Sequence, residues 1–307
     1  MALLRLGLIA DVQHADLPNG RSAYGATRFY RDSVNKAKLA AQDWSEQCCA
    51  FAVNLGDSID RRAASGASAA LGRVLQAFAA FSPVLHLPGN HDLSALSKTD
   101  VALLSPVLGL AGLSAVAGGA CYCDVSIGPG WRALLLDSYD VAVCRDAEKA
   151  RPLRAQLLSE ARARGEHAAY LTEHEELNGA VGEEQLAWLQ ERLGAAAEAR
   201  ERAVVFSHAA MRPEATIYRD AVCWNCHEVS ALLDRYHHVV AAVITGHDHH
   251  FGEAESNAGI YHRVLEAAME GRPGVPTHAI LEMEGDTIRL VGRGGVRCWQ
   301  RTFPPLA

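Results

Sequence analysis

The stretch Asn54-Leu55-Gly56-Asp57-Ser58-Ile59-Asp60 follows an apolar run, Cys49 to Val53, that is typical of a short buried strand. Gly56 allows the backbone to turn sharply where this strand ends. Asp57 then lies at the carboxyl end of the strand, where open α/β sheets place their ligand-binding groups. Burying a carboxylate there is unfavourable unless a positive charge meets it. Taken alone, Gly-Asp-Ser favours an ordinary turn or helix cap, so its meaning depends on the rest of the chain.

Four other apolar runs end in polar residues of similar types. The runs and the residues that follow them are Leu3 to Ala10 before Asp11-Val12-Gln13-His14, Val84 to Leu87 before Pro88-Gly89-Asn90-His91-Asp92, Ala203 to Phe206 before Ser207-His208, and Val239 to Ile244 before Thr245-Gly246-His247-Asp248-His249-His250. Because side chains alternate along a strand, Asp11 and Gln13 are expected to face one way and His14 the other.

Helices are predicted between these strands, at residues 27–46, 63–81 and 183–200, from apolar side chains that recur at helical spacing. This alternation predicts a largely parallel sheet with its loops gathered on one edge. Residues 121–127 and 132–137 are predicted to form a hairpin, and 93–119 to be helical and then glycine-rich. The charged segment 145–176 is interpreted as a helical surface insertion, and 260–265, 277–282 and 287–291 as a terminal meander of strands. No linker divides the chain, so residues 1–307 are expected to form one domain.

Composition narrows the class of protein. The chain has 307 residues, 49% of them hydrophobic, and a formal net charge of −7 without a basic block, so we expect no nucleic-acid partner. No apolar run approaches the ~18 residues of a membrane span, and Met1 to Ala10 lacks a signal-peptide cleavage site. The eight scattered cysteines are therefore expected to be reduced thiols in a cytoplasmic protein. Cys223-Trp224-Asn225-Cys226-His227 matches a haem-attachment pattern, which we attribute to chance.

The five strand ends together indicate a metal site. Strand ends on one edge of a sheet converge, and two carboxylates ~4 Å apart repel by ~4 kcal/mol at an effective dielectric of ~20. Divalent cations remove this repulsion. Mixed histidine, carboxylate and amide donors suit Mn²⁺, Fe²⁺ or Zn²⁺ better than an all-oxygen Ca²⁺ site.

In order and composition, the motifs from residue 11 to residue 249 resemble those of the calcineurin-like metallophosphoesterases. They are Asp11-x-Gln13, Gly56-Asp57-x-x-Asp60, Gly89-Asn90-His91-Asp92, Ser207-His208 and Gly246-His247-Asp248-His249. The resemblance implies an α/β fold, a four-layer αββα sandwich of two mixed sheets flanked by helices.

One departure from the family pattern points to a subgroup. The first motif is usually Asp-x-His, whereas this chain has Gln13 in the third position, which resembles the manganese-dependent ADP-ribose/CDP-alcohol diphosphatases. Four looser matches favour the same subgroup: Thr27 to Arg31, Leu177-Asn178-Gly179 ahead of Glu184 to Leu189, Val222 to Asn225, and Gly292 to Gly294.

The resemblance also implies a set of site residues. Two divalent metals, Mn²⁺ in preference to Fe, Zn or Mg, would be bridged by Asp57, the first held by Asp11, Gln13 and His249 and the second by Asn90, His208 and His247. A bridging water with its pKa lowered toward ~7 would attack phosphorus. His91 would donate a proton near the leaving oxygen, and Asp92 would orient it.

The expected partner is a small nucleotide whose diphosphate bond is cleaved. Candidate binding residues are Tyr24, Arg28, Cys223, Trp224 and Asn225, with core packing an equal alternative for the aromatic side chains. Cyclic-nucleotide phosphodiesterase or phosphomonoesterase activity on the same metal site, and a non-catalytic scaffold, remain alternatives. A nuclease is disfavoured by the absence of a basic surface. Oligomeric state stays open.

Overall fold

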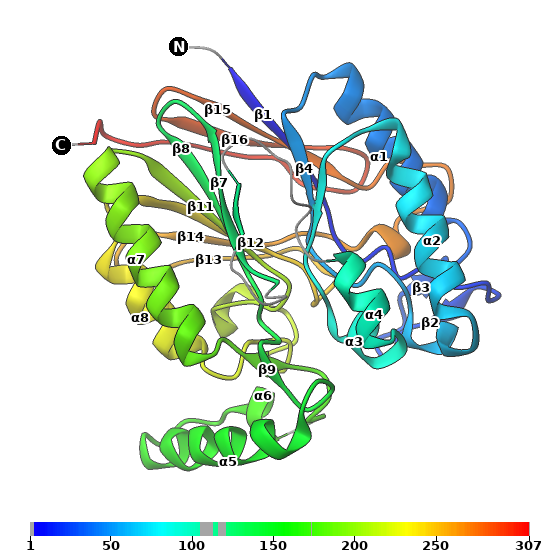
Figure 1. The fold of residues 1–307 in the computed structure, drawn as a ribbon, viewed down its shortest axis with the longest axis horizontal. Helices are drawn as coiled ribbons and strands as arrows, with labels where there is room; N and C mark the ends of the chain where they lie inside the picture. The colour runs from blue at the N-terminus through cyan, green and yellow to red at the C-terminus, as the bar shows by residue number, and fades with distance from the viewer. Residues whose placement is uncertain (1–2, 105–112, 116–120, 173, 307) are drawn as a thin grey trace.

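The computed structural model describes residues 3–104, 113–115, 121–172 and 174–306. Two β-sheets pack face to face, and helices cover the outer face of each sheet (Figure 1). The predicted four-layer αββα sandwich is therefore confirmed. Helices α1 and α2 flank one sheet, whereas α7 and α8 flank the other.

The first sheet has six strands and combines a parallel half with an antiparallel half. Its order is β17 (Trp299–Thr302), β16 (Thr287–Gly292), β15 (Ala279–Glu284), β1 (Leu4–Ile9), β4 (Phe51–Asn54) and β5 (Val84–His86). β1, β4 and β5 are parallel, so the loops that follow them leave the sheet at one edge. Its helices are α1 (Ser33–Glu46) and α2 (Ala67–Ala77).

The second sheet has seven strands, of which β8, β11, β12 and β14 are parallel. Its order is β13 (Gly252–Glu255), β14 (Tyr261–Val264), β12 (Val240–Thr245), β11 (Arg202–Ser207), β8 (Trp131–Leu136), β7 (Cys123–Gly128) and β6 (Leu113–Ala115). β7 and β8 form the predicted hairpin. Its helices are α7 (Glu183–Ala199) and α8 (Cys226–Arg235).

The main core lies between the two sheets. Leu6 and Leu8 of β1 pack there with residues of β4, β8 and β11, while Ile9 packs on the other face of the sheet in the same cluster as Trp44 of α1. Burying each such aliphatic side chain contributes roughly 1.5–3 kcal/mol to the free energy of folding. Gly7 is required where Trp44 crosses β1, because a Cβ at this position would lie 2.4 Å from the indole ring. The strand is thus fixed from both faces.

Two predicted elements are wrong in their extent or place. The helix predicted from Thr27 begins at Ser33, because Thr27–Arg28 (β3) pairs instead with Gly20–Arg21 (β2) in a small hairpin. The predicted terminal meander is divided, since β14 joins β12 in the second sheet and β15 to β17 belong to the first.

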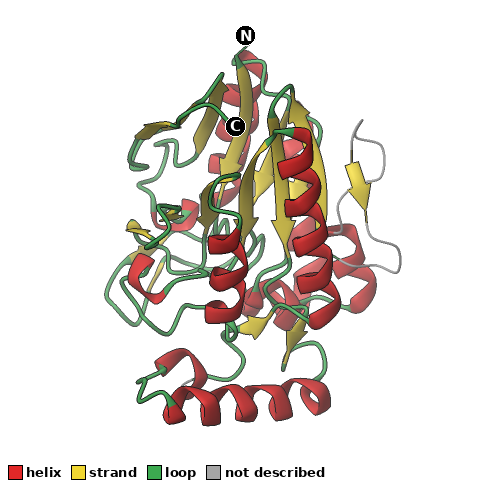
Figure 2. Cartoon of the chain, turned by 90° about the vertical axis from the view of Figure 1, so that its left-hand side faces the viewer, coloured by secondary structure: helices red, strands yellow, loops and turns green. Residues whose placement is uncertain are grey.

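The remaining elements are short, except for α5 (Ala147–Ala163), which lies beside α6 (Ala169–Thr172) at the base of the molecule (Figures 1 and 2). The others are η1 (Arg61–Gly66), η2 (Phe78–Ala80), α3 (Asn90–Ala95), α4 (Lys98–Val101), η3 (Ala102–Leu104), β9 (Val141–Ala142), β10 (Gly179–Ala180), η4 (Pro213–Ala215) and η5 (Ala268–Glu270). Part of the 93–119 prediction lies outside the described residues. None of the helices in the described ranges has the length and apolarity needed to cross a membrane.

Candidate metal centre

The loops after β1, β4, β5, β11 and β12 bring the predicted metal ligands together. Asp57, His208 and His247 each offer a ligand atom, and these three atoms lie within 4.8 Å of one another. The amide of Gln13 lies 3.0 Å from Asp57 Oδ2 and 2.8 Å from His249 Nε2. His249 Nε2 is in turn 3.3 Å from Asp11 Oδ1. All of these residues are buried.

Most of these residues have a left-handed backbone conformation. Of the eight non-glycine residues with positive φ in the described ranges, five are predicted ligands: Asp11 (52°), Gln13 (40°), Asp57 (54°), His247 (72°) and His249 (70°). The prediction that Asp11 and Gln13 occupy alternate positions of a strand is therefore wrong, because β1 ends at Ile9. Backbone hydrogen bonds stabilise the strained loop that carries Asp11 and Gln13, among them the bond from Gln13 N to Asp57 O at 2.8 Å. His14 turns away, and its Nδ1 bonds to Tyr30 O.

Four buried atoms in this cluster have no hydrogen-bond partner, namely Asp11 Oδ1, Gln13 Oε1, Asn90 Oδ1 and His208 Nε2. Leaving such atoms unpaired inside a protein costs about 1–3 kcal/mol each. All four belong to predicted metal ligands, and all four can donate a lone pair to a cation. The arrangement therefore fits divalent metal ions of the kind that accept mixed oxygen and nitrogen donors.

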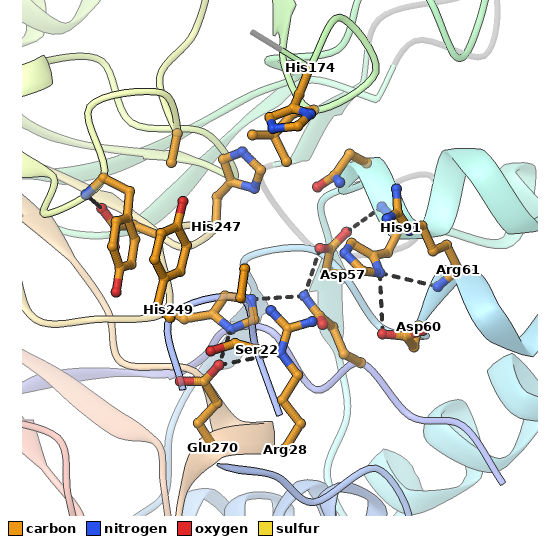
Figure 3. A pocket seen from close by; sticks show the side chains of 18 of the residues that line it. Ser22, Arg28, Asp57, Asp60, Arg61, His91, His174, His247, His249 and Glu270 are labelled. Atoms are coloured by element: carbon orange, nitrogen blue, oxygen red, sulfur yellow. Dashed lines mark hydrogen bonds and ion pairs between the residues drawn. The ribbon is translucent and has the colours of Figure 1, made fainter. Parts of the chain in front are cut away.

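Hydrogen bonds to the far nitrogen of each ring orient the three histidines. His208 Nδ1 donates to Leu55 O at 2.7 Å, which leaves Nε2 as the donor of a lone pair. His249 Nδ1 donates to Glu270 Oε1 at 2.8 Å (Figure 3). Its Nε2 lies on the side of Asp11, 3.3 Å from Oδ1. His208 and His249 can therefore each bind a metal ion through Nε2.

His247 is oriented by Asn178. The Asn178 amide nitrogen donates to Asp220 O, so its Oδ1 accepts from His247 Nε2 at 3.0 Å. The His247 Nδ1 atom therefore remains available as a ligand. Sequence reasoning did not assign Asn178 or Glu270 to the site, although Asn178 lies in a stretch that matches the diphosphatase subgroup. Glu270 follows no apolar strand, so strand-end spacing gave no signal for it.

Three motif glycines allow the loops to approach closely. A Cβ on Gly89 would lie 2.0 Å from Asp57 Oδ1, and one on Gly56, whose φ is +110°, would lie 2.4 Å from His208 Nδ1. A Cβ on Gly246 would lie 2.7 Å from Asp11 Oδ2. These glycines are therefore needed for contact between loops and not only for turning the chain.

Opposite charges in the cluster shift each other's pKa values strongly. Burial opposes ionisation of Asp57, but the positive charge of His208 holds its pKa well below the usual range. Burial likewise opposes protonation of His208, yet the Asp57 carboxylate raises its pKa to about 9. The carboxylates thus make this centre attractive to cations.

His91 lies beside Asp60 and not beside Asp92. His91 Nδ1 accepts a hydrogen bond from Arg61 N at 3.1 Å and lies 3.4 Å from Asp60 Oδ2 (Figure 3). The prediction that Asp92 orients His91 is wrong. As the third residue of α3, Asp92 points back and accepts from the backbone N–H groups of Ser58, Ile59 and Gly89. Asp92 therefore joins the loops after β4 and β5.

A cavity of about 620 Å³ opens above the candidate ligands. Two of the residues predicted to bind substrate, Tyr24 and Arg28, line this cavity. Tyr24 stacks on Tyr218 with ring centroids 3.5 Å apart and an interplanar angle of 14°. Arg28 Nε is 3.5 Å from Glu270 Oε1. The cavity is large enough to hold a nucleotide-sized ligand.

Cys223, Trp224 and Asn225 do not line this cavity, which corrects their assignment to substrate binding. All three are buried; Cys223 and Trp224 pack in the core that α7 and α8 form with the second sheet. Trp224 N donates to Gly179 O, and the Asn225 amide bonds to Val181 N and O. The loop thus supports the segment that carries Asn178, and core packing was the right alternative.

The calcineurin-like phosphoesterase family matches residues 4–251, which carry every candidate ligand, and the chain belongs to this family. Within it, the chain is 32% identical to a protein of Oryza sativa subsp. japonica named manganese-dependent ADP-ribose/CDP-alcohol diphosphatase, over 99% of this chain and 95% of the relative. A protein of the same name from Arabidopsis thaliana is 33% identical over 94% of each. Among solved structures, a dimetal phosphatase from Danio rerio superposes with a TM-score of 0.82 at 27% identity, covering 98% and 99% of the two chains.

Proposed function

We propose that this protein is a dimetal hydrolase that cleaves the diphosphate bond of nucleoside diphosphate compounds, ADP-ribose and CDP-alcohols such as CDP-choline. The observation that carries the proposal is the buried donor set, in which four atoms lack a hydrogen-bond partner, beside a nucleotide-sized cavity that is lined by five of its members: Gln13, Asp57, Asn90, His247 and His249. The names of the relatives, which match this chain over nearly its whole length, support the substrate class and manganese as the metal.

Seven residues would hold the two metal ions. Asp57, at the centre of the cluster, is suited to bridge them, with one ion held by Asp11, Gln13 and His249 and the other by Asn90, His208 and His247. When bound, such ions offset the negative charge of a diphosphate and generate a nucleophile from water at neutral pH.

His91 is placed to supply a proton to the departing group. Because its Nδ1 accepts a hydrogen bond from Arg61 N, the neutral ring carries its proton on Nε2. Hydrolysis adds one water across the P–O–P linkage: the water oxygen bonds to one phosphorus, the bond from that phosphorus to the bridging oxygen breaks, and the bridging oxygen leaves with the second phosphate. A proton from His91 Nε2 would neutralise that oxygen.

Tyr24 and Arg28 are the proposed substrate contacts. Tyr24 is 58% exposed and stacked on Tyr218, so this pair of rings offers an aromatic surface at the cavity for a nucleobase, and stacking is worth about 1–3 kcal/mol for each base. Arg28 lines the same cavity beside Glu270, where it could contact an anionic part of the same ligand.

The test uses metal-stripped protein with ADP-ribose or CDP-choline, to which Mn²⁺ or Mg²⁺ is returned. We expect release of AMP and CMP, fastest with Mn²⁺. Hydrolysis of a cyclic nucleotide without release of either product would refute the diphosphatase proposal. His91→Gln should reduce turnover about 100-fold or more while bound manganese, measured by elemental analysis, stays unchanged. Unreduced turnover would refute the role of His91.

A further inference from the structure

The cavity wall that carries His91 also carries an arginine, Arg62, that has no role in the proposed reaction so far. Arg62, at the start of η1, lines the cavity together with Arg28. Asp60 connects Arg62 to His91: its Oδ1 accepts from Arg62 Nε at 2.9 Å, and its Oδ2 lies 3.4 Å from His91 Nδ1. A single carboxylate therefore places Arg62 on the same side of the cavity as the proposed proton donor.

The position of the Arg62 guanidinium is fixed by two contacts. Its Cζ lies 4.4 Å from the centre of the buried Tyr30 ring, and its Nε is held by Asp60. Among the described residues, none accepts a hydrogen bond from its Nη1 or Nη2 atoms. The planar guanidinium thus presents an unused pair of donors, and such a pair matches two oxygens of one phosphate.

Arg28 adds a second positive charge to the same wall. Its Nε lies 3.5 Å from Glu270 Oε1, and the same Glu270 oxygen also accepts the His249 hydrogen bond. Arg28 and Arg62 both line this cavity, and the charge of Arg28 adds to burial in lowering the pKa of Arg62. Two cations held together at a cavity wall favour binding of an anion between them.

We propose that Arg62, assisted by Arg28, binds the phosphate group that departs when the diphosphate is cleaved, and so selects diphosphates over single phosphodiesters. This inference rests on the proposed function. As the P–O bond breaks, the departing phosphate changes from a singly charged diester to a monoester that carries −1.5 to −2 at pH 7. Donors aimed at this developing charge stabilise the transition state more than the bound substrate.

The test compares two substrates in the manganese-loaded protein. CDP-choline has a departing phosphate, whereas the p-nitrophenyl ester of thymidine 5′-monophosphate keeps a nucleoside and one phosphorus but releases p-nitrophenolate. Arg62→Gln should lower kcat/KM for CDP-choline about 100-fold and leave that for the nitrophenyl ester within about threefold. Arg62→Lys should give an intermediate loss, because lysine keeps the charge without the paired donors.

Arg73→Gln is the matched control, since Arg73 is exposed, does not line the cavity and loses the same charge. Its kcat/KM for both substrates should stay at the wild-type value. Turnover of the nitrophenyl ester also shows that each variant is folded and metal-loaded.

An equal loss on both substrates would overturn the inference, because Arg62 would then act only by holding Asp60 and His91. Full activity of Arg62→Gln on CDP-choline would overturn it as well. Wild-type protein that cleaves only the nitrophenyl ester would instead refute the proposed function, and this inference with it.

Discussion

Replacing Glu270 tests whether a residue outside the ligand set controls metal binding. Glu270 Oε1 accepts from His249 Nδ1 at 2.8 Å, and its side chain is only 10% exposed. Glu270→Gln keeps an oxygen that can accept this hydrogen bond but removes the charge, which makes His249 a weaker donor to metal. Glu270→Ala removes the hydrogen bond too and frees the ring to rotate. We expect manganese affinity to fall about 10-fold in the first variant and about 100-fold in the second.

These losses correspond to about 1.4 and 2.8 kcal/mol of binding free energy. The assay is titration of metal-stripped protein with Mn²⁺, in which free manganese is followed by electron paramagnetic resonance and activation by release of CMP. Glu282→Gln is the control, because Glu282 is also a partly buried, ion-paired glutamate but contacts Arg5, at the opposite end of β1 from Asp11. If Glu270→Ala binds manganese as tightly as the wild type, the orienting role argued from the His249 contact is wrong.

Three further predictions concern the loops, the buried histidines and the metals. Gly89→Ala should reduce activity about 100-fold or more because its Cβ would lie 2.0 Å from Asp57 Oδ1, whereas Gly72→Ala, on an open position of α2, should raise the free energy of unfolding by about 0.5–1 kcal/mol. Activity assays and urea denaturation measure both, and an active Gly89→Ala would contradict the packing argument. Burial, aided by the charge of Arg212, lowers the pKa of His262 to about 3, so the unfolded chain takes up a proton below pH 6.5 that the folded chain does not. Between pH 7 and pH 5.5, the wild type should therefore lose about 1 kcal/mol more stability than His262→Gln, and parallel stability curves would disprove this. Removing metal with a chelator should lower the melting temperature, and manganese at 100 times its Kd should restore about 2.7 kcal/mol; an unchanged melting temperature would mean that the folded chain binds no metal.

The part of the site that sequence predicted best consists of residues next to strands. Asp57 comes three residues after the end of buried β4, and His208 follows buried β11 directly, so the local hydrophobic pattern and the geometry of parallel strands were enough to bring them together. The alternation of strands and helices predicted a largely parallel sheet, and the resemblance of the motifs implied the two-sheet sandwich that the structure has. The hydrophobic pattern and the motifs are properties of short segments, so they can be recognised without knowledge of distant contacts.

The errors arose where a distant contact decides the outcome. Asp92 stands next to His91 in sequence, but its position in the first turn of α3 directs it to backbone N–H groups, and Asp60 from another loop takes the place beside His91. Trp224 belongs to a polar-looking loop, yet the pairing of its backbone with Gly179 buries the indole. Glu270 reaches His249 only because η5 folds back onto the loop after β1, where Ala268 N meets Ala10 O. No pattern within a window of residues contains these contacts.

The left-handed residues around the metal centre have a consequence for protein design. Copying the ligand side chains onto another α/β scaffold would not reproduce the site, because Asp11, Gln13, Asp57, His247 and His249 all need a backbone conformation that ordinary loops avoid. A graft would have to transfer the supporting sheet edge together with its loops, including the glycines that let them touch. The unit that would have to be transferred is therefore the backbone of these loops, and the ligand side chains alone do not define the site.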